Sequence, residues 1–127
     1  MAISGMNHFT ILAEDLDATR SFYTEVLGLT EGYRPPLSFP GLWLYAGDHP
    51  IVHVIQRSPL PEPGGLFDHV AMTATDLSGV VQTLKARDIG YSLSQQAGTE
   101  VWQLFLRDPN GVKIELAFAA DEGPVEA

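Results

Sequence analysis

The sequence predicts an α+β protein built from two βαβββ modules, and three observations support this prediction. A short segment recurs, because NHFTILAEDL at residues 7–16 and DHVAMTATDL at residues 68–77 share a histidine, an alanine and an Asp-Leu pair at matching positions. Each copy is followed by apolar residues at helical spacing and then by strand-like segments. A Pro- and Gly-rich join, RSPLPEPGG at 57–65, separates the two halves.

The first module covers about residues 6–57, and its opening strand leads into a predicted helix in DLDATRSFYTEVLGL. We expect Asp15 or Asp17 to cap this helix and Gly28 to end it. Further strands are expected near 29–33, in LWLYA at 42–46 and in IVHVIQ at 51–56. The apolar stripe of the helix consists of Phe22, Tyr23, Val26 and Leu27.

Two loops of the first module stand out. GDHP joins its last two strands, which places His49 in a surface turn without a role. The Pro-rich segment YRPPLSFPG at 33–41 has the irregular composition of a functional loop and is a candidate lid.

The second module covers about residues 68–118, after a linker at 58–67. Asp76 is the expected cap of its helix and Gly90 the expected stop. Strands are predicted near 91–95 and in EVWQLFL and VKIELAF, which the turn RDPNG joins. The acidic tail at 119–127 is expected to fray. The apolar stripe of this helix consists of Leu77, Val80, Val81 and Leu84.

Composition limits the classes of protein that fit. A chain of 127 residues with 45% hydrophobic residues can form one compact domain or two half-size modules, and the absence of cysteine excludes disulfides and thiolate metal sites. The net charge of −9 argues against nucleic acid or an anionic membrane as a partner. No apolar run is long enough to span a bilayer, and the N-terminus does not resemble a signal peptide. We therefore expect a soluble cytoplasmic protein.

Strand alternation predicts which side chains share a face. In the opening strands, Phe9 and Ile11, and likewise Val70 and Met72, should lie under the helices, so the histidine of each copy faces the other side. The final strand of each module adds one polar residue flanked by apolar ones. The resulting set has equivalent positions in the two modules and consists of His8, His53, His69 and Glu115.

These four residues are candidate metal ligands. A single strand histidine, or a single mid-strand glutamate, is usually structural or solvated, but a symmetric set on one face points to a shared role. Imidazole and carboxylate donors suit Zn, Ni, Fe, Mn or Co. A carboxylate–imidazolium pair without metal is the alternative.

The segments DLDATRSFYTEVLGL and RDPNGVKIEL resemble the vicinal oxygen chelate superfamily, which includes glyoxalase I, extradiol dioxygenases, fosfomycin-modifying enzymes and bleomycin-binding proteins. The resemblance covers about residues 6–118 of a single domain, 1–127. It implies two βαβββ modules whose cup-shaped mixed sheets surround a metal site with His8, His53, His69 and Glu115 as ligands. His53 departs from glyoxalase I, which usually has glutamate there.

The resemblance also implies chemistry. A divalent metal would chelate two adjacent oxygens of a small-molecule substrate and promote proton transfer, as in an isomerase or lyase, with Glu115 as the base and His53 as a second base or ligand. The alternatives are a ring-cleaving Fe(II) dioxygenase, a fosfomycin-type thiol transferase and a non-catalytic binding or resistance protein. If His53 is not a ligand, the residues favour the dioxygenase interpretation more strongly.

Other residues could contribute to substrate binding. If the substrate contained glutathione, its carboxylates would need cations to bind them. Lys113 is one candidate, because it shares a face with Glu115. A salt bridge at the rim of the sheet is the alternative explanation for Lys113. A homodimer with shared sites is expected from the stiff linker and from the resemblance. The aromatic candidates for a pocket lining are Phe39, Trp43, Tyr45 and Trp102, and the remaining cations are Arg20, Arg34, Arg57, Lys85, Arg87 and Arg107.

Overall fold

The computed structural model describes residues 2–62 and 65–125. The chain divides into two compact units, Met1–Pro61 and Glu62–Ala127. This boundary falls within the expected linker, of which residues 63 and 64 lie outside the described part, as do Met1 and the last two residues of the acidic tail. No helix of the described residues has both the length and the apolar character needed to cross a membrane.

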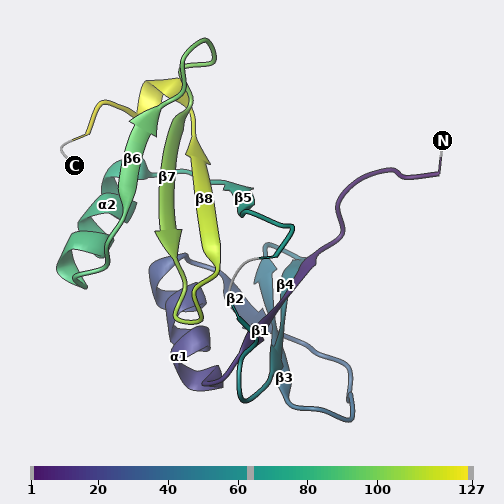
Figure 1. The fold of residues 1–127 in the computed structure, drawn as a ribbon. Coiled ribbons are helices and arrows are strands. Elements are labelled where there is room, and N and C mark those ends of the chain that lie inside the picture. Colours follow the sequence, from purple (N-terminus) through teal and green to yellow (C-terminus); the bar gives the residue numbers. More distant parts are fainter. Residues whose placement is uncertain (1, 63–64, 126–127) are drawn as a thin grey trace. The chain divides into compact units, whose positions relative to one another are not determined.

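Unit one contains a four-stranded mixed sheet in the order β1-β4-β3-β2 (Figure 1). β1 runs parallel to β4, and the other neighbours are antiparallel. Between β1 and β2 the chain forms a helix, α1, which continues directly into a π-helical turn, η1. The elements are β1 (Phe9–Ala13), α1 (Leu16–Ser21), η1 (Phe22–Val26), β2 (Thr30–Gly32), β3 (Gly41–Ala46) and β4 (His49–Gln56).

Unit two repeats this topology, with the sheet order β5-β8-β7-β6 and β5 parallel to β8. Figure 1 shows α2 lying along the sheet of its own unit. The predicted α+β fold of two βαβββ modules is therefore confirmed. The elements are β5 (Val70–Thr73), α2 (Leu77–Ala86), β6 (Ser92–Gln95), β7 (Trp102–Arg107), β8 (Lys113–Phe118) and a 3₁₀ turn, η2 (Ala120–Glu122).

The helix of unit one begins as predicted but changes its winding. The Asp15 carboxylate accepts a hydrogen bond from the Ala18 N–H at 3.1 Å, and Gly28, with φ of +78°, follows the last turn. The sequence did not predict the π-helical turn, in which the Leu27 N–H reaches the Phe22 carbonyl at 3.2 Å. Phe22, Tyr23 and Val26 of this turn are buried, as expected for the apolar stripe.

Three expectations need correction, and the first concerns His49. It is the first residue of β4 rather than part of the turn, because its backbone pairs with Ala46 of β3. It is exposed as expected, and its ring Nε2 lies 2.6 Å from the Asn7 carbonyl.

The second correction concerns the end of α2, which stops at Ala86 rather than at Gly90. Asp88 takes the left-handed conformation there, with φ of +56°. The N–H groups of Asp88 and Ile89 donate to the carbonyls of Lys85 and Leu84, which satisfies the open end of the helix.

The third correction concerns the acidic tail, part of which is ordered on unit two. The Glu122 carboxylate accepts the N–H of Leu77 at 2.9 Å, at the first turn of α2. The Trp102 indole donates to the Ala120 carbonyl at 3.2 Å. These bonds satisfy donors that would otherwise lack partners, so residues 120–122 do not fray.

Each unit buries the apolar face of its own sheet, as the alternation predicts. In unit two, for example, Ile114 and Phe118 of β8 are buried, whereas Lys113 and Ala117 are only partly covered. His8 and His69 each lie one residue before a strand rather than inside it. The opposite face of each sheet carries the candidate ligands.

Candidate metal centre

In unit one, the sheet brings His8 and His53 together. The parallel pairing of β1 with β4 sets Thr10 opposite His53, and His8 lies two residues earlier on the same side of the chain. The two imidazole rings stack with their centroids 3.7 Å apart and their planes 17° from parallel. The imidazole of His8, which directly precedes β1, thus lies beside the imidazole of His53 on β4.

Trp43 covers the other face of the His53 ring. It pairs with His53 across β3 and β4, and the two rings stack at 3.9 Å with an interplanar angle of 8°. His53 therefore lies between His8 and Trp43, which restricts its rotation. Trp43 was predicted only as a pocket-lining aromatic residue.

The surroundings of His53 lower the pKa of its imidazole. Burial is the main cause that lowers its pKa, and the charges of His8 and Arg34 lower it further, whereas a hydrogen bond with the Pro50 backbone opposes them. Its Nε2 is buried and has no hydrogen-bond partner among the described residues. Both the lowered pKa and the unpartnered Nε2 favour the neutral imidazole, which is the form that binds metals.

In unit two, His69 and Glu115 form the equivalent pair. β5 pairs with β8 in the register Ala71 to Glu115, which matches the register of Thr10 to His53 in unit one. The His69 Nε2 lies 3.1 Å from Oε1 of Glu115. Glu115 is only 8% exposed, and the Gln103 amide donates to its Oε2 at 3.3 Å. A buried carboxylate needs such partners.

The residues that precede His8 and His69 orient their rings. Nδ1 of His8 lies 2.6 Å from the Asn7 side-chain oxygen, and Nδ1 of His69 lies 2.7 Å from Oδ2 of Asp68. An acceptor at Nδ1 leaves Nε2 of His8 as the nitrogen that can bind a metal. Nε2 of His69 instead faces Oε1 of Glu115, as in the alternative of a carboxylate–imidazolium pair without metal. Sequence reasoning missed both acceptors, although Asn7 and Asp68 hold the same position in the repeated segment.

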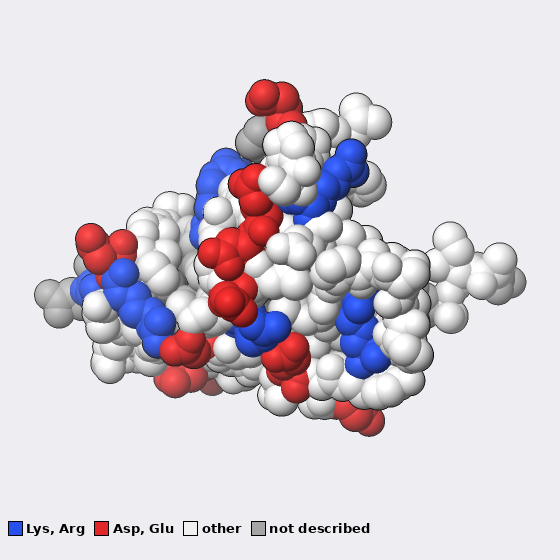
Figure 2. Space-filling model, turned by 90° about the horizontal axis from the view of Figure 1, so that it is seen from below, with Lys and Arg blue, Asp and Glu red and all other residues white. Residues whose placement is uncertain are grey.

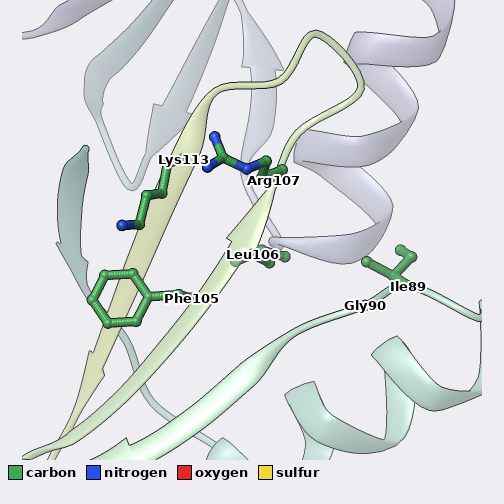
Figure 3. A pocket seen from close by; sticks show the side chains of 6 residues that line it. All are labelled: Ile89, Gly90, Phe105, Leu106, Arg107 and Lys113. Carbon is green, nitrogen blue, oxygen red and sulfur yellow. The ribbon is translucent and has the colours of Figure 1, made fainter. Parts of the chain in front are cut away.

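Lys113, the cation singled out from the sequence, forms a salt bridge. Its Nζ lies 3.2 Å from Asp68 Oδ2 and 5.1 Å from the centroid of the Phe105 ring. The pKa of Asp68 is lowered by its hydrogen bond to His69 first and by Lys113 second. Figure 3 shows Lys113, Phe105 and Arg107 beside an open pocket of about 330 Å³ that Ile89, Gly90 and Leu106 complete.

The structure thus brings the four predicted ligands together as two pairs, one in each unit. Within the described part of the chain, no group of three or more histidine, aspartate or glutamate side chains could hold a metal ion by itself. Of the other aromatic candidates, Trp102 contacts the C-terminal turn, and the Tyr45 hydroxyl donates to the Tyr33 carbonyl at 2.5 Å.

Charged side chains of both signs alternate on the face shown in Figure 2, without a broad basic patch. Arg20 illustrates the pattern, because it forms ion pairs with both Asp17 and Glu31. Local pairing of this kind leaves little net positive field on this face for a polyanion.

The two units thus carry equivalent mixed sheets, each with a histidine-containing pair at matching register. Residues 5–116 match the Glyoxalase/Bleomycin resistance protein/Dioxygenase superfamily, and the chain belongs to this superfamily. It is 30% identical over 124 residues to Glyoxylase I 4 of Arabidopsis thaliana, a match that covers 90% of this chain and 70% of that protein.

Solved structures show the same fold. A glyoxalase family protein from Bacillus anthracis has a TM-score of 0.78 and 21% identity, over 94% of this chain and 98% of that one. The fosfomycin resistance protein FosX of Listeria monocytogenes has a TM-score of 0.74 and 18% identity, over 92% and 94% of the two chains. Lactoylglutathione lyase of Agrobacterium tumefaciens has a TM-score of 0.68 and 19% identity, over 98% and 100%.

Proposed function

We propose that this protein is a metal-dependent enzyme of the glyoxalase type, which acts on a small molecule with two adjacent oxygens by proton transfer. The observation that carries the proposal is the pairing of donors in equivalent register, with a buried ring nitrogen of His53 that no described residue satisfies. An unsatisfied buried nitrogen is costly unless something binds it.

The donor set fits a divalent metal. His8, His53 and His69 offer imidazole nitrogens and Glu115 a carboxylate, which suit Zn, Ni, Fe, Mn or Co. Asn7 and Asp68 supply the outer hydrogen bonds that usually accompany metal-binding histidines. Superfamily membership supports the same proposal, since related enzymes generally depend on a metal.

When bound, such an ion supplies Lewis-acid chemistry, because it stabilises negative charge that develops on substrate oxygens. Glu115 is the residue that moves the proton, taking it from the carbon next to a substrate carbonyl and returning it to the neighbouring carbon. The Gln103 amide holds Oε2 of Glu115, so Oε1 is the oxygen directed toward His69. Burial of Glu115 keeps bulk water from exchanging that proton.

His53 decides between two reaction types. If all four residues held the ion, fewer positions would remain for substrate than with three ligands, and ring cleavage of a catechol would need a further position for dioxygen. The His53 ring lies on the His8 face of the sheet rather than in the helix-side core, which supports its role as a donor. The isomerase or lyase reaction is therefore favoured over dioxygenase chemistry.

Metal content tests the site. We expect His69→Ala and Glu115→Ala each to lose bound metal, as measured by elemental analysis and native mass spectrometry of freshly purified protein. Asp48→Ala is the control, because it also removes a carboxylate and Asp48 is exposed in the turn before β4. Metal retained in both site variants at the control level would refute the assignment.

Ligand binding and turnover test the reaction. A hydroxamate chelator should bind the metal-loaded protein much more tightly than the metal-free protein, as measured by calorimetry. Equal affinity would indicate a binding protein instead. Hemithioacetals, catechols, and fosfomycin with thiols should then be assayed side by side. If the protein turns over only catechols, the dioxygenase alternative replaces the isomerase or lyase assignment. If it turns over only fosfomycin with thiols, the thiol transferase alternative replaces it.

A further inference from the structure

Arg34, in the Pro-rich loop at 33–41, is a half-buried cation whose donors are mostly unused. One of its terminal nitrogens, Nη2, donates to the Phe39 carbonyl at 2.9 Å, and the guanidinium lies 5.1 Å from the centroid of the Phe39 ring. Its Nε is buried without a hydrogen-bond partner among the described residues. Within residues 2–62 and 65–125, no carboxylate forms an ion pair with it.

The guanidinium lies on the same face of the sheet as the His8–His53 pair. A Cβ on Gly41 would come within 2.2 Å of the Val54 carbonyl and within 2.9 Å of Nη2 of Arg34, so the guanidinium lies against Gly41 on β3. Gly41 and Trp43 are two residues apart on β3 and share a face, and Trp43 stacks on His53. The charge of Arg34 is also close enough to contribute to the lowered pKa of His53.

We propose that Arg34 binds a carboxylate of the substrate, so that this site selects anionic molecules that carry a carboxylate in addition to their two adjacent oxygens. The choice of substrate class rests on the function proposed above. The chain has a net charge of −9 and would otherwise repel such molecules. A local cation with free donors offsets that repulsion where the substrate binds.

The donor pattern favours a carboxylate over a purely structural role. A guanidinium has five N–H donors in a planar fork that matches a carboxylate, and the described contacts of Arg34 use one of them. A residue that only fastened the loop to Phe39 would not need a buried, unpaired Nε, since such a donor costs stability. A ligand that accepts from Nε would remove this cost.

Two hydroxamates of equal length test the proposal on the metal-loaded protein. One is the monohydroxamate of succinic acid, which ends in a carboxylate, and the other ends in the neutral carboxamide. Calorimetry should show the carboxylate probe binding about tenfold more tightly to the wild type, as expected for a charge-assisted hydrogen bond. This preference should disappear in Arg34→Gln and persist in part in Arg34→Lys.

Arg87→Gln is the matched control, because it changes the net charge equally and lies at the end of α2. It should keep the full preference for the carboxylate probe. A preference that is unchanged in Arg34→Gln, or lost equally in the control, would overturn the proposal.

A second measurement separates this proposal from the proposed function. In metal-free protein, the Arg34 Nε–H signal in ¹H–¹⁵N NMR spectra, identified by its absence in Arg34→Lys, should shift saturably with succinate and not with succinamide. If both hydroxamates bind equally well with and without metal, the proposed function fails. The succinate titration alone then decides the role of Arg34. No shift with succinate would then refute carboxylate binding. The titration also decides the case if Arg34→Gln does not fold.

Discussion

At the scale of single residues, the side chains next to the ligands hold the donors in place. Asp68 accepts from Nδ1 of His69 and also pairs with Lys113, so one carboxylate fixes both the tautomer and the position of a ring that is partly exposed. Asn7 does the same for His8 in unit one. The repeated segment therefore conserves a two-residue unit, an acceptor followed by a histidine.

Removal of the Asp68 carboxylate should weaken metal binding without removing a ligand. We expect Asp68→Ala to lower metal affinity by about 10- to 100-fold, the usual effect of losing an outer hydrogen bond to a metal-binding histidine. Asp68→Asn keeps an acceptor and should retain most of the affinity. Competition against a chelator of known affinity measures both, with Asp48→Ala in the turn before β4 as the control. Equal affinities in all three variants would contradict the positioning role.

The sequence predicted the four candidate ligands but not their immediate neighbours. Alternation within a strand places His53 and Glu115 on a face without knowledge of other strands. The stacking of Trp43 on His53 depends instead on the register between β3 and β4, which shifts at Leu44 and Tyr45. Such an irregularity leaves no clear signal in the local pattern, so Trp43 was identified only as an aromatic candidate.

At the scale of elements, the sequence predicted the described strands and both α-helices, whereas their ends depended on particular backbone conformations. α2 ends where Asp88 adopts a positive φ, although a glycine follows two residues later. The 3₁₀ turn of the tail forms because Glu122 and Ala120 accept hydrogen bonds from residues far away in the sequence. Neither effect follows from local propensity.

The cap of α2 gives a prediction at this scale. Asp76 has φ of +66°, and its carboxylate accepts from the Gly79 N–H at 3.2 Å. Asp76→Ala loses the cap and leaves a side chain in a left-handed conformation, so it should destabilise the protein by about 1–2 kcal/mol. Asp76→Gly loses the cap but tolerates the conformation, and should cost only about a few tenths of a kcal/mol.

Urea denaturation followed by circular dichroism measures both free energies of unfolding. Asp15→Ala is the comparison in unit one, because Asp15 also caps a helix but has an extended φ of −113°. Its loss should cost about 1 kcal/mol through the cap alone. A larger cost for Asp76→Gly than for Asp76→Ala would show that the left-handed conformation of Asp76 does not contribute.

At the scale of the whole molecule, the two units have the same topology and carry their donor pairs at the same register, although the donors differ. The second unit has glutamate where the first has His53, so equivalent positions carry different donors. The repeat is visible in the sequence because a histidine directly precedes the opening strand of each unit.

We predict a homodimer in which each site takes His8 and His53 from one chain and His69 and Glu115 from the other. The linker contains Pro59, Pro61 and Pro63, which favour an extended, stiff segment. A stiff joint hinders consecutive modules from closing face to face, and exchange between two chains gives two equal sites under two-fold symmetry.

Complementation between two inactive variants tests the exchange. A His8→Ala chain and a Glu115→Ala chain, carrying different tags, are unfolded, mixed and refolded, and the heterodimer is isolated through both tags. With shared sites, one site of the heterodimer carries both lesions and the other carries none, so it should bind about half the metal of the wild-type dimer. Each variant refolded alone is the control and should bind little metal. If a heterodimer verified by mass spectrometry binds no more metal than the separate variants, each site belongs to a single chain. In that case each of its two sites carries one substitution.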